Sequence, residues 1–172
     1  AKRPLPGYAK TRLGEKIGFE ESAGVYARFL YKCLSELAKL DQDEVRVELS
    51  LASDVDVNFF RLAFPEFLIS AQADGSLGQR FSHSLRGAFD NGAEAVVFVG
   101  TDIPGLNHSI ILSAFELLKK NDVVIGPDTD GGYYLIGTRQ RTASLFEGIK
   151  WSSEFVLQET ERLVQPRGKA RT

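Results

Sequence analysis

The acidic residue best placed for chemistry is Asp102. It lies in residues 100–105 (GTDIPG), directly after the apolar run 95–99, which is typical of a strand covered on both faces. In an open α/β sheet, ligands bind beyond the carboxyl ends of the strands, so Asp102 would face the binding crevice. A carboxylate there suits Mg²⁺ or Mn²⁺, which keep positions open for phosphate oxygens. The structural alternative is that Asp102 only caps the turn before Pro104.

A second acidic loop, residues 126–132 (GPDTDGG), follows the next short apolar run. Its carboxylates, Asp128 and Asp130, are two residues apart and can hold Mg²⁺ or Mn²⁺ for a nucleotide diphosphate. The same residues also fit a plain Asp-Gly hairpin turn into Tyr133. When this loop is considered alone, the hairpin turn is the favoured interpretation. Two acidic loops at successive strand ends, together with one basic segment, favour a shared site for metal and phosphate.

The basic segment is residues 1–14 (AKRPLPGYAKTRLG), and its four cations precede the first acidic residue, Glu15. Those cations are Lys2, Arg3, Lys10 and Arg12. Two prolines stiffen the segment, and Gly7 permits a tight turn and the close approach of a ligand, as binding a di- or triphosphate requires. The spacing matches neither the P-loop nor the dinucleotide fingerprint. The alternative is a solvated basic arm.

Weaker signals lie farther along the chain. Gly78 and Arg80 belong to a glycine-rich approach to a helix; they could touch a base or a ribose, or be only a loop and an exposed arginine. Trp151 could line an acceptor pocket, although a lone Trp is more often part of the packing. Cys33 lies on an apolar helix face and is expected to be inert core. The two histidines have no partner at metal-binding spacing, so we assign them no chemistry.

Hydrophobic periodicity indicates helices that alternate with strands. Helices are predicted near residues 20–40, 77–89, 107–120 and 153–164, and strands at residues 45–51, 95–99, 123–125 and 133–136. Asn107 is placed to cap the third helix. This alternation predicts an α/β fold with a mostly parallel central sheet and helices on both faces. The whole chain, residues 1–172, is expected to form a single domain.

The composition argues against several classes of protein. The 172 residues include 21 Lys and Arg against 23 Asp and Glu, a net charge of −2, which disfavours a nucleic-acid partner bound through a broad basic field. No apolar run approaches the roughly 20 residues that a membrane helix needs, and no signal-peptide pattern opens the chain. The single cysteine cannot form an internal disulfide, so the cytoplasm is the expected location.

In order and content, these segments resemble those of bacterial glycosyltransferase-A-like proteins, the nucleotide-diphospho-sugar transferases of the selenodomain-associated type. The matching segments are residues 2–13 (KRPLPGYAKTRL), 77–80 (LGQR), 99–106 (VGTDIPGL), 126–137 (GPDTDGGYYLIG) and 145–153 (LFEGIKWSS). Together they span almost the whole chain, and the combination of GTDIPGL with DGGYYLIG is specific.

The resemblance implies a Rossmann-like nucleotide-diphospho-sugar transferase (GT-A) fold that binds Mg²⁺ or Mn²⁺. It makes Asp102 the metal carboxylate and Asp130 a second metal-binding or acceptor-contacting group, so both are candidate catalytic residues. The candidate nucleotide- and phosphate-binding residues are Arg3, Gly7, Lys10, Arg12, Gly78 and Arg80. The candidate acceptor residues are Gly131, Gly132, Tyr133 and Trp151. The family normally has a strand before the Lys2 segment and an acidic strand end after the last helix, and we expect both to lie outside this sequence.

The leading hypothesis is a metal-dependent glycosyltransferase that uses a nucleotide-activated donor and an acceptor yet to be identified. Lys10 and Arg12 would offset the charge that builds on the leaving phosphate. One alternative is a nucleotidyltransferase, in which a phosphorylated acceptor attacks a nucleoside triphosphate and pyrophosphate leaves. A second alternative is a non-catalytic module that binds nucleotide sugars. The cationic first segment favours a triphosphate, whereas the family resemblance favours sugar transfer.

Overall fold

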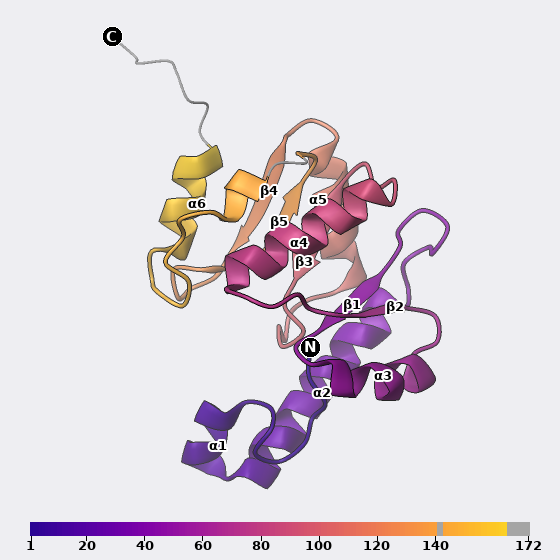
Figure 1. The fold of residues 1–172 in the computed structure, drawn as a ribbon, viewed down its shortest axis with the longest axis vertical. Helices are drawn as coiled ribbons and strands as arrows, with labels where there is room; N and C mark the ends of the chain where they lie inside the picture. Colours follow the sequence, from indigo (N-terminus) through magenta and orange to yellow (C-terminus); the bar gives the residue numbers. More distant parts are fainter. Residues whose placement is uncertain (141–142, 165–172) are drawn as a thin grey trace. The chain divides into compact units, whose positions relative to one another are not determined.

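The chain folds into two structural units that alternate along the sequence (Figure 1). The computed structural model describes residues 1–140 and 143–164. Unit 1 consists of Ala1–Gln72 and Thr101–Ile110, and unit 2 consists of Ala73–Gly100 and the chain from Ile111 onward. Asp102 therefore belongs to unit 1, whereas Asp130 belongs to unit 2.

Unit 1 is built from helices and one pair of strands. In chain order its elements are α1 (Thr11–Ile17), α2 (Phe19–Leu37), β1 (Glu48–Leu51), the 3-10 helix η1 (Asp54–Asp56), α3 (Val57–Ala63) and β2 (Leu68–Ala71). Strands β1 and β2 pair in parallel, with Glu48 opposite Leu68 and Leu51 opposite Ala71. Strand β2 and helix α3 were not predicted from the sequence, because their apolar runs are too short to show a clear period.

The core of unit 1 forms where the apolar face of α2 is buried. Of the residues that the helical period marks on this face, Phe29 is only half-buried, and the others are buried, namely Tyr26, Leu30, Cys33, Leu34 and Leu37. Leu51 from β1 and Phe60 from α3 are fully buried. Burying a side chain of this size stabilises the fold by about 1.5–3 kcal/mol. The prediction that Cys33 is a core residue is confirmed.

Unit 2 contains a three-stranded sheet with helices. Its elements are α4 (Leu77–Asp90), β3 (Val96–Val99), α5 (His108–Leu118, which begins in unit 1), β4 (Val123–Pro127), β5 (Tyr133–Thr138), the 3-10 helix η2 (Ala143–Phe146) and α6 (Val156–Val164). Helix α4 begins with a capping box, in which the Ser76 hydroxyl accepts a hydrogen bond from the Gln79 amide while the Gln79 side chain accepts one from the Ser76 amide.

The sheet of unit 2 is antiparallel, which corrects the prediction of a mostly parallel central sheet. The strand order is β3-β5-β4, and β5 runs antiparallel to both neighbours. The reason is the length of the connection between β4 and β5. Five residues close a hairpin, whereas a parallel connection needs a crossover of about a dozen residues or more. Only the β1–β2 pair is parallel within the described residues. The α/β class is correct, but a Rossmann-like sheet is not what the described strands form.

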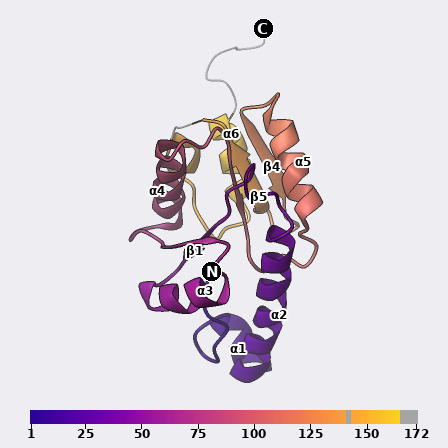
Figure 2. The same cartoon turned by 90° about the vertical axis from the view of Figure 1, so that its right-hand side faces the viewer.

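Helices α4 and α5 cover opposite faces of this sheet, as predicted (Figure 2). Leu85 and Phe89 of α4 belong to one buried cluster with Ile136 of β5. The next residue of β5, Gly137, lies against Leu118 of α5 on the other face. Successive residues of a strand point to opposite faces, so the two helices lie on opposite sides of the sheet. Within the described residues no helix has the length and apolar character needed to cross a membrane.

Candidate functional site

Lys10 and Asp102 meet in unit 1, although 92 residues separate them in the sequence. The Lys10 ammonium forms an ion pair with Oδ2 of Asp102, and the two side chains are 38% and 35% exposed. The Lys10 ammonium also lies 5.9 Å from the centre of the Tyr26 ring. Asp102 thus pairs with a cation of the basic segment, which the alternative of a simple turn cap before Pro104 does not require. The predicted juxtaposition of the basic segment with an acidic strand end holds for this pair.

The backbone of Lys10 is in a conformation that non-glycine residues rarely adopt. Its φ is 51° and its ψ is 43°, the left-handed region, at the residue that precedes α1. This conformation costs about 1–2 kcal/mol for a residue with a Cβ. The buried Ser22 donates a hydrogen bond to the Lys10 carbonyl (3.2 Å), and the Gly14 amide donates a second (2.9 Å). These contacts hold Lys10 in place, and strain of this kind is concentrated at functional sites.

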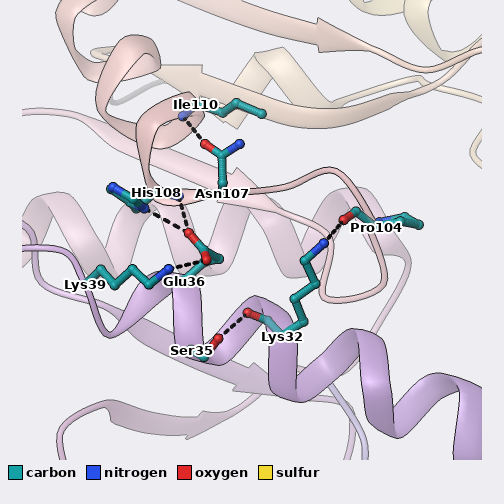
Figure 3. Close-up of polar contacts among 8 residues, drawn as sticks. All are labelled: Lys32, Ser35, Glu36, Lys39, Pro104, Asn107, His108 and Ile110. Atoms are coloured by element: carbon teal, nitrogen blue, oxygen red, sulfur yellow. Dashed lines mark hydrogen bonds and ion pairs between the residues drawn. The ribbon is translucent and has the colours of Figure 1, made fainter.

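Helix α2 ties down the loop that carries Asp102 (Figure 3). Lys32 Nζ donates a hydrogen bond to the Pro104 carbonyl (2.6 Å). One turn later, Glu36 Oε2 accepts a hydrogen bond from the His108 amide (3.2 Å) and lies 2.8 Å from His108 Nδ1. Hydrogen bonding from His108, followed by the ion pair with Lys39, lowers the pKa of Glu36 to about 2. We call these two tethers, Lys32–Pro104 and Glu36–His108, the α2 clamp.

The α2 clamp leads into the start of helix α5. There the Asn107 side-chain oxygen accepts a hydrogen bond from the Ile110 amide (3.1 Å). This contact confirms the prediction that Asn107 caps the helix. The loop from Asp102 to the first turn of α5 is therefore fixed both by α2 and by its own cap.

Arg3 is held by a buried carboxylate that sequence reasoning missed. Asp56 is 1% exposed, and its Oδ2 accepts hydrogen bonds from the Arg3 amide and the Tyr8 hydroxyl, both at 3.0 Å. The Arg3 guanidinium lies 4.0 Å from Asp56 Oδ1 and 4.5 Å from the centre of the Phe59 ring. Through these contacts Arg3 anchors the basic segment. Its phosphate-binding role stays a prediction.

The remaining candidates of unit 1 differ in their surroundings. Arg12 is exposed on α1, where a ligand can reach it. Gly7 has a φ of 71°, so the turn itself requires glycine there, and nothing lies within 4 Å of the position of an added Cβ. Burial, together with the smaller effect of the negative charge of Asp102, raises the pKa of the Cys33 thiol to about 11. Cys33 is therefore protonated at neutral pH and is not a nucleophile.

In unit 2 the second acidic loop is the β4–β5 hairpin. The Asp128 amide donates to the Gly132 carbonyl (3.0 Å), while Asp128 Oδ1 accepts from the Thr129 amide (2.6 Å). Asp128 is therefore engaged in the turn, as the hairpin alternative expected. Asp130 is exposed and stays a candidate.

Gly131 connects this hairpin to the start of α6. Its φ is 79°, and an added Cβ would lie 2.1 Å from the Glu154 carbonyl oxygen. Its own carbonyl accepts a hydrogen bond from the Leu157 amide (2.9 Å), which satisfies a donor in the first turn of α6. Packing therefore explains Gly131, whereas nothing lies within 4 Å of a Cβ at Gly132.

Two more candidates of unit 2 lie at helix α4. Gly78 is buried, and an added Cβ would lie 2.4 Å from the Phe146 carbonyl oxygen and 2.8 Å from Trp151 Nε1. Arg80 Nε donates a hydrogen bond to the Gly75 carbonyl (3.0 Å). Both residues thus have structural contacts, and their roles toward a base or ribose are untested.

Tyr133 and Trp151 belong to an aromatic cluster. Their ring centres are 6.4 Å apart, and the Trp151 ring lies 5.5 Å from that of Phe81. Burial raises the pKa of the Tyr133 hydroxyl. Packing within the aromatic cluster therefore explains part of the contacts that both side chains make. Trp151 remains half-buried at the edge of a pocket.

No preformed metal centre lies within residues 1–140 and 143–164, where no three His, Cys, Asp or Glu side chains are grouped as metal ligands. Asp102 already has a lysine ammonium as partner, which competes with a metal cation for the same carboxylate. The protein side chains alone therefore do not fit a bound Mg²⁺ or Mn²⁺. Mg²⁺ is commonly held by one or two carboxylates together with substrate phosphates, so the metal prediction can be tested only with a donor present.

Comparison with known proteins identifies the family. A bacterial protein family described as "Uncharacterized protein conserved in bacteria (DUF2064)" matches residues 34–153. This chain belongs to the DUF2064 family. The match includes Asp102 and the β4–β5 hairpin, while Lys10 and Arg12 lie outside it.

A solved structure is similar to this DUF2064 protein over more of the chain than the family match covers. A protein from Desulfovibrio desulfuricans G20, provisionally described as a nucleotide-diphospho-sugar transferase, is 35% identical with a TM-score of 0.85. The likeness covers 94% of this chain and 71% of that one. Comparison with curated proteins found no match. The family resemblance drawn from the sequence motifs is thus confirmed.

Proposed function

We propose that this protein is a transferase that binds a nucleotide-activated sugar donor and holds the donor's phosphates at Lys10. The likeness to the Desulfovibrio protein over 94% of the chain carries the choice of reaction class. The ion pair between Lys10 and Asp102 supports the choice of site, because it presents a fixed, half-exposed ammonium on the basic segment.

The donor's phosphates would replace Asp102 as the partner of the Lys10 ammonium. An ion pair in which both side chains are more than a third exposed contributes only about 0–1 kcal/mol, so it can open at little cost. A diphosphate carries more negative charge than one carboxylate and forms stronger charge-assisted hydrogen bonds. Asp102 would thus keep Lys10 oriented until the donor binds.

In the proposed reaction, an acceptor oxygen forms a bond to the sugar carbon while the bond from that carbon to the phosphate oxygen breaks. The nucleoside diphosphate leaves with the electron pair of that bond, and Lys10 and Arg12 offset the charge that accumulates on it. The acceptor's proton goes to a carboxylate, for which Asp102 and Asp130 are the candidates. These two residues lie in different units, so a separate alanine variant tests each of them.

The test is turnover of UDP- and GDP-sugars and of nucleoside triphosphates, each with and without Mg²⁺ or Mn²⁺. The proposal predicts a free nucleoside diphosphate as product and a rate at least a hundredfold lower in Asp102→Ala or in Asp130→Ala, whichever carboxylate takes the acceptor's proton. Pyrophosphate as product would make the protein a nucleotidyltransferase instead. Metal-independent donor binding without turnover, equal in the wild type and in Asp102→Ala, would make it a binding module. Turnover that needs no added metal would contradict the predicted metal dependence alone.

A further inference from the structure

A pocket in unit 2 is lined by two of the candidate residues, Gly78 and Trp151, and takes no part in the Lys10–Asp102 pair. It lies between one face of α4 and the segment from η2 to Trp151, with a volume of about 390 Å³. The α4 wall consists of Ser76, Gly78, Gln79, Ser82 and Arg86. The facing wall consists of residues 146–149 and Trp151. Pockets for small molecules begin at about 300 Å³, so this one suits a ligand no larger than a monosaccharide.

The two walls are fixed with respect to each other. At Gly78 the helix backbone approaches so closely that an added Cβ would lie 2.4 Å from the Phe146 carbonyl oxygen. The facing wall also packs on α4 itself, because the rings of Phe146 and Trp151 lie 5.1 Å and 5.5 Å from the ring of Phe81, a residue of α4. The pocket is therefore preformed, which lowers the entropy cost of binding.

The pocket has one cation and one anion that are both available to a ligand. Arg86 and Glu147 line it and are exposed, and neither side chain makes a hydrogen bond or ion pair in the part of the chain that the structure describes. Their charges cancel, so the pocket does not favour an anion such as phosphate, unlike the basic segment of unit 1. The Arg86 guanidinium can donate several hydrogen bonds to a ligand, and the Glu147 carboxylate can accept several.

Trp151 adds an apolar ring face to these polar groups. A cyclic polyol presents C–H groups on the faces of its ring and hydroxyls around the edge. Such a ring can pack on an indole while its hydroxyls bond to Glu147 and Arg86. We infer that this pocket binds a neutral, polyhydroxylated ring of monosaccharide size. This role rests on the proposed function: in the transferase reaction, the pocket would hold the acceptor.

The chain contains a single tryptophan, Trp151, so intrinsic fluorescence reports directly on this pocket. The probes are the methyl glycosides of glucose, galactose and mannose, with inorganic phosphate as the charged comparison. At least one glycoside is expected to give a saturable change in fluorescence, and phosphate none. Glu147→Ala and Arg86→Ala are each expected to raise the dissociation constant at least tenfold. The matched controls Glu161→Ala and Arg162→Ala remove exposed charges on α6 and should leave it unchanged.

Three results would overturn the inference: no saturable response to any of the three glycosides, equal weakening in the pocket and control variants, or competition by phosphate. The proposed function fails separately. A saturable glycoside response in a protein that neither binds nor turns over nucleotide sugars would keep the pocket and reject the transferase. Donor turnover without a glycoside response would keep the transferase and reject the pocket.

Discussion

At the scale of single residues, Lys10 combines an unfavourable backbone with a charge that the proposed function needs. A lysine with a φ of 51° is less stable than glycine would be at the same position. Its side chain gains little in return, because its ion pair with Asp102 is half-exposed. The side chain is therefore better explained by binding than by stability.

This account predicts the order of stability of two variants at this position. Lys10→Gly relieves the backbone strain and loses the ion pair and the contact with the Tyr26 ring, both made by a half-exposed side chain, so it should unfold with a free energy at least equal to that of the wild type. Lys10→Ala keeps the strain and loses the pair, so it should be about 1 kcal/mol less stable than Lys10→Gly. Urea denaturation measures both. Equal stability of the two variants would show that the backbone of Lys10 is not strained.

Residue identity alone could not have revealed the partner of Arg3. The sequence singles out the four cations of the basic segment, but Asp56 lies 53 residues from Arg3 in a short run with no motif. Asp56 is distinguished only by its burial, which depends on how α3 and η1 pack. By contrast, the pairing of Lys10 with Asp102 was within reach, because both residues lie in loops that the motif pattern already selects.

At the scale of secondary-structure elements, the α2 clamp is the feature that fixes the loop of Asp102. Lys32→Ala removes the bond to the Pro104 carbonyl, whereas Lys39→Ala removes a partner of Glu36 that does not touch the loop. We expect Lys32→Ala to speed hydrogen exchange in residues 101–108 about fivefold, corresponding to about 1 kcal/mol. Lys39→Ala should leave exchange in that loop within a factor of two. Equal exchange in both variants would show that Lys32 does not restrain the loop.

The α2 clamp is expected to weaken in acid, because it depends on the charged form of the Glu36 carboxylate. Its pKa is lowered from 4.5 to about 2, so the charged carboxylate stabilises the fold above pH 4.5 and loses this effect as the pH falls toward 2. In Glu36→Gln nothing titrates at this position. The difference in unfolding free energy between wild type and Glu36→Gln should therefore shrink as the pH falls from 4.5 to 2. Urea denaturation at several pH values measures it, and a constant difference would contradict the assignment.

The β4–β5 hairpin offers a matched pair of glycines. Gly131→Ala must accommodate both a φ of 79° and a Cβ at 2.1 Å from the Glu154 carbonyl oxygen, so we expect a loss of about 3–5 kcal/mol. Gly132→Ala meets no atom within 4 Å and should cost less than about 1 kcal/mol. Thermal and urea unfolding compare the two. Similar losses in both variants would show that α6 does not pack against Gly131.

The positions of most elements are predicted correctly from the sequence, whereas the pairing of the strands in unit 2 is not. The 3.6-residue period located α2 and α4, and alternating residues located β1, because these signals are local. The sheet of unit 2 was expected to be parallel because strands alternate with helices along the chain. The five residues between β4 and β5 are too few for a crossover, and this length was the sequence signal that would have given the antiparallel hairpin.

At the scale of the whole molecule, the candidate residues are divided between two units. Lys10 and Asp102 belong to unit 1, whereas Asp130 and the pocket at Trp151 belong to unit 2. The DUF2064 match crosses both units. If the proposed function holds, variants of unit 1 should weaken donor binding, and variants of the pocket should weaken glycoside binding.

The most direct test of the account is calorimetric binding of nucleotide sugars to Lys10→Ala. We expect UDP- or GDP-sugar affinity to fall at least tenfold, about 1.4 kcal/mol, and affinity for the matching nucleoside monophosphate to fall much less. Lys16→Ala, which removes an exposed cation on α1, is the control and should bind like the wild type. Equal weakening toward diphosphate and monophosphate ligands, or unchanged binding in Lys10→Ala, would contradict a phosphate site at Lys10.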